Sequence, residues 1–162
     1  MSSYKNVLRT AELMKEMNCY KNEYFDDRIL IQKKLFLTFR CGICNDFDFS
    51  WGQRGVYSAD LNLVSHTILK NDPIYLKKHK LSTKEQDIVK YINGLAKEIE
   101  RNDLDISEVS WYELLADILY LSDQGLEKDH IIETLKQDGI DYSPKVIKHA
   151  FKTNTKGKWN KA

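Results

Sequence analysis

Hydrophobic residues recur at helical spacing along most of the chain. In residues 4–17 they return every three or four positions with lysines and glutamates between them, which predicts an amphipathic helix. Residues 25–40 are apolar on most sides, so we expect a buried central helix whose one apolar face is interrupted at Lys33. Similar patterns predict helices over residues 58–70, 83–101, 111–121, 126–138 and 143–152.

A different pattern occupies residues 46–51. Aromatic residues alternate strictly with Asp or Ser there, which predicts a short, half-buried strand. Gly52 and Gly55 bracket a tight loop after it. Residues 74–78 fit either a second short strand or a loop.

These elements predict a mainly α (α+β) fold. The chain has 162 residues, of which 42% are hydrophobic, enough for one domain with a core. We expect a single domain over residues 1–152, with about seven helices and a small two-stranded β ribbon. The polar residues 153–162 predict a basic, flexible tail.

Two serines resemble helix N-caps with a glutamate three residues later. Ser82 pairs in this way with Glu85, and Ser110 with Glu113. Asp117 lies four residues after Glu113 inside an apolar stretch. Our interpretation is that Asp117 faces solvent beside Glu113.

Charge is distributed unevenly. There are 25 Lys+Arg and 24 Asp+Glu, giving a net charge of +1, which argues against a uniformly basic nucleic-acid binder. Residues 143–162 carry six lysines and no acid, so this end is +6 and residues 1–142 are −5. The alternative function, nucleic-acid binding, would therefore use only the C-terminal end.

Targeting and cysteine signals predict a cytoplasmic protein without a membrane span. No apolar run approaches the length that crosses a bilayer, and the first twenty residues have no apolar signal segment. Three cysteines do not form a disulfide framework.

Catalytic motifs are weak. The pair Cys41 and Cys44 follows the end of a helix, whereas a redox pair needs a helix start and zinc needs two further ligands. Asp46 and Asp48 share a strand face and could hold magnesium, although exposed acids are common there. We expect no catalytic residue, metal or cofactor.

The loop after the predicted strand offers a display surface. A strand, a glycine-bounded loop and a helix start together present Arg54 and Tyr57 to a protein partner. The alternative is that the aromatic residues are core and that Arg54 pairs with a local carboxylate. The candidate partner-binding residues are Lys33, Trp51, Arg54, Tyr57 and Ser58.

A second surface is the basic end. Residues 126–152 have the spacing of a helix-turn-helix, a pattern that structural hairpins share. The lysines that would contact phosphates are Lys145, Lys148, Lys152, Lys156 and Lys158.

Several short motifs resemble those of the YwgA-like group of the Panacea (SocA-like antitoxin) superfamily. The matching segments are Ile31–Leu37 (IQKKLFL), Phe47–Trp51 (FDFSW), Gly55–Ser58 (GVYS) and Trp111–Leu121 (WYELLADILYL). Helices 127–138 and 143–152 are similar to the closing pair, so the likeness spans residues 25–152. The chain departs from the family turn, GPYS, by having Val56 in place of proline.

The resemblance implies a mainly α domain with a small sheet and no established catalytic centre. Some superfamily members are antitoxins that neutralise a toxin by direct contact, and one type delivers its toxin to a protease. We therefore expect a non-catalytic protein-binding module whose partner is a protein, such as a toxin. A homodimer is a further expectation.

Overall fold

The computed structural model describes residues 2–21, 23–71, 74–139 and 141–160. It confirms a mainly helical fold with a small two-stranded antiparallel sheet. The elements in chain order are α1 (Tyr4–Glu16), α2 (Phe25–Arg40), β1 (Ser50–Gly52), β2 (Gly55–Tyr57), α3 (Ala59–Lys70), α4 (Thr83–Gly94), α5 (Lys97–Arg101), α6 (Glu108–Asp123), α7 (Lys128–Gln137) and α8 (Pro144–Thr155). None of the helices in these ranges is both long and apolar enough to cross a membrane.

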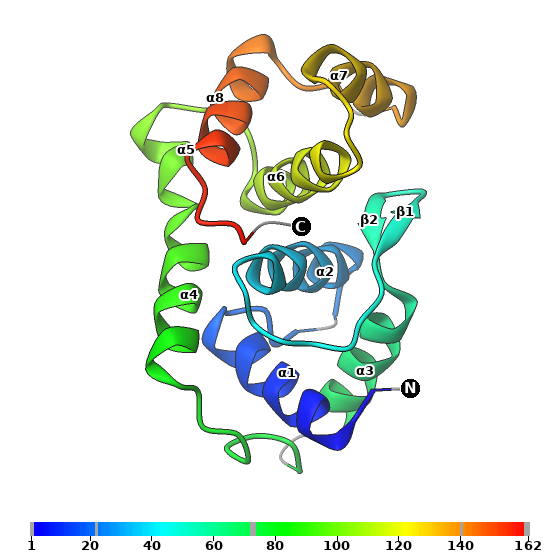
Figure 1. Ribbon diagram of the computed structural model, residues 1–162, viewed down its shortest axis with the longest axis vertical. Coiled ribbons are helices and arrows are strands. Elements are labelled where there is room, and N and C mark those ends of the chain that lie inside the picture. Colours follow the sequence, from blue (N-terminus) through cyan, green and yellow to red (C-terminus); the bar gives the residue numbers. More distant parts are fainter. Residues whose placement is uncertain (1, 22, 72–73, 140, 161–162) are drawn as a thin grey trace.

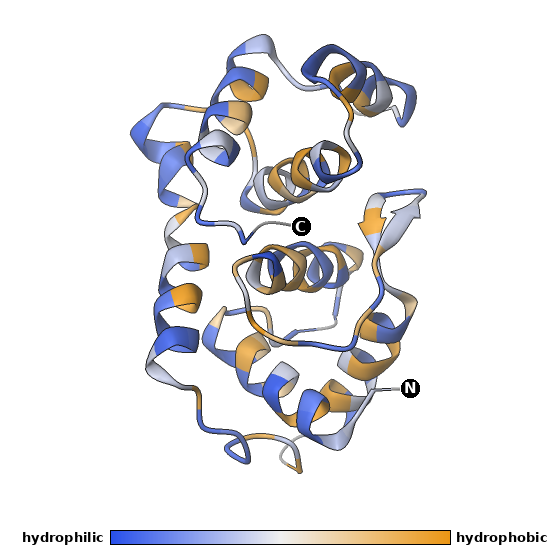
Figure 2. Ribbon diagram, in the orientation of Figure 1, coloured by the Kyte–Doolittle hydropathy of each residue, from blue (hydrophilic) through white to orange (hydrophobic). Residues whose placement is uncertain are grey.

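Helix α2 lies at the centre of the fold, as its apolar circumference predicts. It contacts α1, α3 and α4 as well as α6 and β2, and α6 in turn carries α7 and α8 (Figure 1). The hydrophobic residues of α4 lie on its inner side, toward α2 (Figure 2). The core therefore forms around one helix that is buried on most sides.

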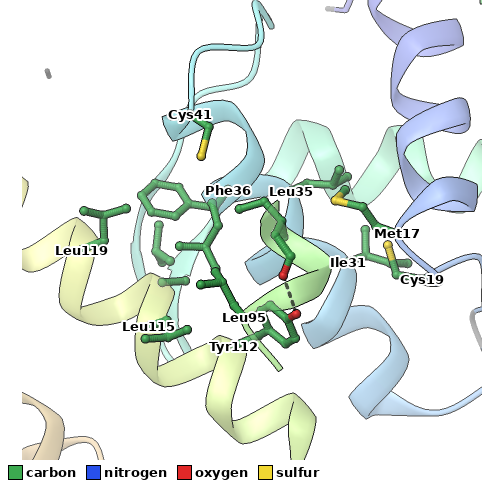
Figure 3. Packing of buried hydrophobic residues seen from close by; sticks show 14 of the residues in the cluster. Met17, Cys19, Ile31, Leu35, Phe36, Cys41, Leu95, Tyr112, Leu115 and Leu119 are labelled. Carbon is green, nitrogen blue, oxygen red and sulfur yellow. Dashed lines mark hydrogen bonds between the residues drawn. The ribbon is translucent and has the colours of Figure 1, made fainter. Parts of the chain in front are cut away.

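The contact between α2 and α6 holds much of the core. Leu35 and Phe36 of α2 lie among apolar side chains that include Leu115 and Leu119 of α6 (Figure 3). Tyr112 is fully buried, and its hydroxyl donates to the carbonyl of Ile92 at 2.6 Å. The polar end of this ring is thus satisfied inside the core.

The helix predicted over residues 83–101 is divided into α4 and α5. The indole of Trp111 donates to the carbonyl of Leu95 at 2.9 Å. Around this point the amides of Leu95 and Ile99 bond three residues back, to Ile92 and Ala96. The backbone tightens to 3₁₀-type bonds there, which separates the two helices.

Helix α6 begins earlier than its predicted cap. Ser107, not Ser110, is the N-cap, and its hydroxyl accepts from the amide of Ser110 at 3.1 Å. The predicted capping box at Ser110 is therefore wrong, whereas the box of Ser82 and Glu85 is present. The three extra residues leave Glu113 within the helix, away from its first turn.

The β ribbon differs from the predicted strand. Of the predicted strand, residues 46–51, only Ser50 and Trp51 pair; together with Gly52 they form β1, whose partner is Gly55–Tyr57. Residues 74–78 form bends and turns, not a second strand. A two-residue loop joins β1 to β2, so the two strands pair as a hairpin. Gly55, the first residue after this loop, has a φ of +84°, a left-handed conformation that glycine adopts without strain.

The C-terminal segment packs against the body up to Asn160. Helix α8 runs to Thr155, and the indole of Trp159 donates to the carbonyl of Asn154 at 3.1 Å. The Asn160 amide donates to the carbonyl of Arg40 at 2.7 Å. Residues 153–160 thus differ from the predicted flexible tail, because an aromatic side chain and backbone hydrogen bonds attach them; the rest of the predicted tail lies outside the described residues.

Candidate functional site

A surface hollow lies beside the β ribbon, where α2 begins and α3 follows β2. Its volume is about 480 Å³. Its lining residues are Phe25, Arg28, Ile29, Gln32, Lys33, Gly52, Gln53, Arg54, Val56, Tyr57 and Asn62. The predicted display loop and the first half of α2 therefore form most of the wall of the hollow.

A buried ion pair lies under the loop. The Nζ of Lys33 is 2.8 Å from Oδ1 of Asp117, and the side chains are only 2% and 1% exposed. The same ammonium donates to the carbonyl oxygens of Arg54 at 2.6 Å and Val56 at 3.0 Å. Lys33 thus supports the loop from within, which makes it a poor direct contact for a partner.

Asp117 is buried, so the interpretation that it faces solvent is wrong. Besides Lys33, its Oδ1 accepts from the amide of Val56 at 3.0 Å. Burial raises the pKa of this carboxyl to about 6, although the Lys33 charge and these hydrogen bonds oppose the rise. A side chain at Gly55 would overlap the carboxylate, so the turn and α6 approach closely because this position is glycine.

The hydrogen bond between the ribbon and α6 requires a backbone N–H at position 56. Val56 has a backbone N–H to donate to Asp117, which is a bond that proline at this position would lack. Its carbonyl accepts from Lys33. The backbone N–H and C=O of Val56 therefore both form hydrogen bonds with the buried ion pair.

A second clamp joins α2 to the start of α3. The side chain of Gln32 donates to the carbonyl of Ser58 and accepts from its amide, each at 2.9 Å. The Ser58 hydroxyl caps α3 by accepting from the Leu61 amide at 3.2 Å. Ser58 is 1% exposed, so this predicted contact residue also supports the site from below the surface.

Arg54 combines a buried partner with an exposed group. Its Nε and Nη2 each lie 3.3 Å from the carboxylate of Glu113. The Glu113 side chain is 3% exposed and that of Arg54 is 51% exposed. Hydrogen bonding to the Glu113 carboxylate raises the pKa of Arg54. The ion pair has its partner 59 positions away on α6, where the sequence suggested a local carboxylate, and the guanidinium remains exposed at the surface.

The two predicted aromatic residues take different positions. Trp51 is partly buried and stacks on Tyr120 of α6, with ring centroids 5.9 Å apart. Tyr57 lines the hollow and is 38% exposed. Of the five predicted partner-binding residues, Arg54 and Tyr57 therefore reach the surface and Trp51 reaches it in part.

Several residues of the site were not predicted from the sequence. They are Phe25, Arg28 and Asn62 at the hollow, and Gln32, Glu113 and Asp117 in the buried network. One signal was available, because Lys33 is the one charge on an apolar helical face and Asp117 is the one charge within residues 114–121. Two such charges of opposite sign favour a buried pair.

None of the five C-terminal lysines predicted to contact phosphates lines the hollow. The five predicted phosphate contacts are all exposed: Lys145, Lys148, Lys152, Lys156 and Lys158. Val146 and Ala150 are buried on the other side of α8. The first three lysines thus form an outward stripe, as their spacing predicts.

The cysteines form no disulfide. Cys41 and Cys19 are buried and Cys44 is exposed. Burial raises the pKa of the Cys41 thiol to about 11, which leaves little of the reactive thiolate at neutral pH. Within the ranges described, no three His, Cys, Asp or Glu side chains gather in a way that could hold a metal ion.

Comparison with known proteins found no matching family model, curated protein or solved structure.

Proposed function

We propose that the chain is a non-catalytic, cytoplasmic protein-binding module of the antitoxin-like kind, related to the YwgA-like Panacea proteins. One observation carries this proposal: a rigid turn displays Arg54 and Tyr57 beside an apolar hollow of about 480 Å³. The partner is a protein, such as a toxin, that contacts this turn and the hollow.

Rigidity of the turn favours binding. Lys33 holds two carbonyl groups of the turn, and Asp117 holds one of its amides. A surface already fixed in position loses little conformational entropy when a partner docks. Because these supports are buried, a partner meets the surface groups without displacing them.

The acids nearest the hollow have structural roles. Asp117 is paired with Lys33, and Glu113 is paired with Arg54. A general base needs a carboxylate within reach of a substrate proton, whereas both of these are buried behind the loop. This favours binding over catalysis as the role of the site.

Capture of a partner with matched variants tests the proposal. Arg54→Gln keeps a polar side chain opposite Glu113, whereas glutamate would place a second negative charge against that buried carboxylate. Arg101→Gln is the control, because Arg101 is 65% exposed and also pairs with a glutamate, Glu98. The tagged wild-type and variant proteins are co-expressed with the product of the adjacent open reading frame, and recovery is quantified.

The proposal expects recovery of the adjacent gene product by the wild type and by Arg101→Gln, with at least a tenfold loss for Arg54→Gln. Rescue of growth from a toxic neighbour should follow the same order. Equal recovery by all three proteins would place the contact elsewhere. Light scattering of the purified protein tests whether it also forms a homodimer.

A second candidate is nucleic-acid binding through α8. The observation that favours it is the exposed stripe of Lys145, Lys148 and Lys152. Counterion release makes such binding weaken steeply with salt. Titration of duplex and single-stranded DNA at two salt concentrations, with Lys148→Glu/Lys152→Glu as the variant, tests it; absence of binding at low salt rejects it.

A further inference from the structure

We infer that the hollow beside the ribbon accepts an apolar peptide side chain that adjoins a carboxylate, such as the C-terminal residue of a partner. This inference rests on the proposed function, since it names the chemistry that the partner presents at the same site. Three features of the lining support it: its apolar surface, its two guanidinium groups and the side-chain amide of Asn62.

The apolar part of the lining comes from three elements. Phe25 and Ile29 lie on the first turns of α2, Val56 on β2, and Tyr57 at the end of β2. The Phe25 side chain is 52% exposed although it belongs to the predicted buried helix. An exposed ring beside a hollow is a surface that an apolar partner group can cover.

The charge of the lining is positive at its rim. The guanidinium carbons of Arg28 and Arg54 lie 5.5 Å and 5.4 Å from the centroid of the Phe25 ring. Among the described residues, no acid lines the hollow and no carboxylate forms an ion pair with Arg28. Asp26 acts on Arg54 electrostatically from outside the lining. A carboxylate at the rim would therefore gain charge-assisted hydrogen bonds.

Two further hydrogen-bond donors at the hollow suit a small anion. The Nη1 of Arg54 is unused by Glu113, which takes Nε and Nη2. The side-chain amide of Asn62, a half-buried residue, also lines the hollow. A single carboxylate can use these donors without breaking the pair between Arg54 and Glu113.

A polyanion fits the same surface less well. Residues 1–142, which contain the hollow, carry a net charge of −5, so a chain of phosphates would be repelled beyond the two arginines. The observations thus favour a carboxylate on a peptide over a nucleotide.

Three small probes test this chemistry directly. Isotope-labelled full-length protein is titrated with N-acetyl-phenylalanine, with N-acetyl-phenylalanine amide and with uridine monophosphate, while amide NMR shifts are followed. We expect the acid to shift the signals of Gln53, Arg54 and Asn62. The uncharged amide should bind about tenfold more weakly, which is the usual effect of losing a charge-assisted hydrogen bond.

Variants of the two arginines then test which guanidinium groups bind the carboxylate of the probe. Arg28→Gln and Arg54→Gln should each weaken binding of the acid about tenfold, and Arg101→Gln should leave it unchanged. Equal binding of acid and amide, no shift with any probe, or a preference for uridine monophosphate would overturn the inference. If Arg54-dependent capture of a protein persists in those cases, the proposed function stands and only the carboxylate chemistry fails.

Discussion

The ammonium of Lys33 and the carboxylate of Asp117 lie 2.8 Å apart in the core, although 84 positions separate them in the chain. Lys33 comes from α2, Asp117 from α6, and both also bond the backbone of the ribbon turn. The pair therefore joins the two central helices to the candidate binding surface. The contribution of this ion pair to the unfolding free energy can be measured on the isolated protein.

Removing one member of this pair should be costly. Lys33→Met leaves the Asp117 carboxylate buried without its cation, which typically costs about 3–5 kcal/mol of unfolding free energy. The double variant Lys33→Met/Asp117→Asn should lose less than the sum of the two single variants. Urea denaturation measures all four proteins, and Arg101→Met, at an exposed pair, should change stability by less than about 0.5 kcal/mol. A loss below about 1 kcal/mol for Lys33→Met would contradict the prediction.

Stability should also depend on the protonation of Asp117. Its folded pKa is about 6 and its ordinary value is 3.8, so between these pH values the folded state holds a proton that the unfolded state releases. This contribution is fully present below about pH 4 and is lost as pH rises to above 6. At about 1.4 kcal/mol per pKa unit, the change is at most about 3 kcal/mol.

Denaturation of the wild type and Asp117→Asn from pH 4 to pH 7 isolates this effect. The unfolding free energy of the wild type, relative to the variant, should fall with rising pH across that window. A difference that stays constant, or that rises with pH, would show that the carboxyl has no raised pKa in the folded protein.

The close approach of Gly55 to Asp117 predicts a strong effect of a single methyl group. Gly55→Ala places a Cβ against the buried carboxylate at a φ of +84°, and should cost about 2 kcal/mol or more. Gly94→Ala is the control, since an added Cβ there meets no atom within 4 Å. That variant should be neutral or stabilised by up to about 1 kcal/mol in thermal denaturation.

The docked C-terminal segment makes a prediction of its own. The ring of Trp159 lies 5.9 Å from that of Tyr91, and its indole caps the carbonyl of Asn154. Trp159→Ala should therefore cost about 1–2 kcal/mol of stability, whereas Lys156→Ala, at an exposed position, should change it by less than about 0.5 kcal/mol. A flexible tail would leave both variants equal to the wild type in urea denaturation.

The sequence by itself determined the local features of the protein. Apolar spacing located α1, α2 and α3 and identified α2 as the central helix, because side chains three and four residues apart share a helical face. Ser58, Ser82 and the run Ser143-Pro144 marked helix starts through hydrogen bonds that span three residues. The display loop at Arg54 was also found, since its glycines and flanking elements are neighbours in the chain.

Only the tertiary structure decided which faces meet. Periodicity assigns Lys33 and Asp117 to their helical faces but does not show that the two side chains pair with each other. A charged side chain is buried only where an opposite charge and hydrogen bonds compensate its desolvation. That compensation comes from an element 84 residues away. The buried Glu113 and the docking of Trp159 on Tyr91 depend on the same kind of distant contact. So does the hollow, which exists because α2, the ribbon and α3 converge.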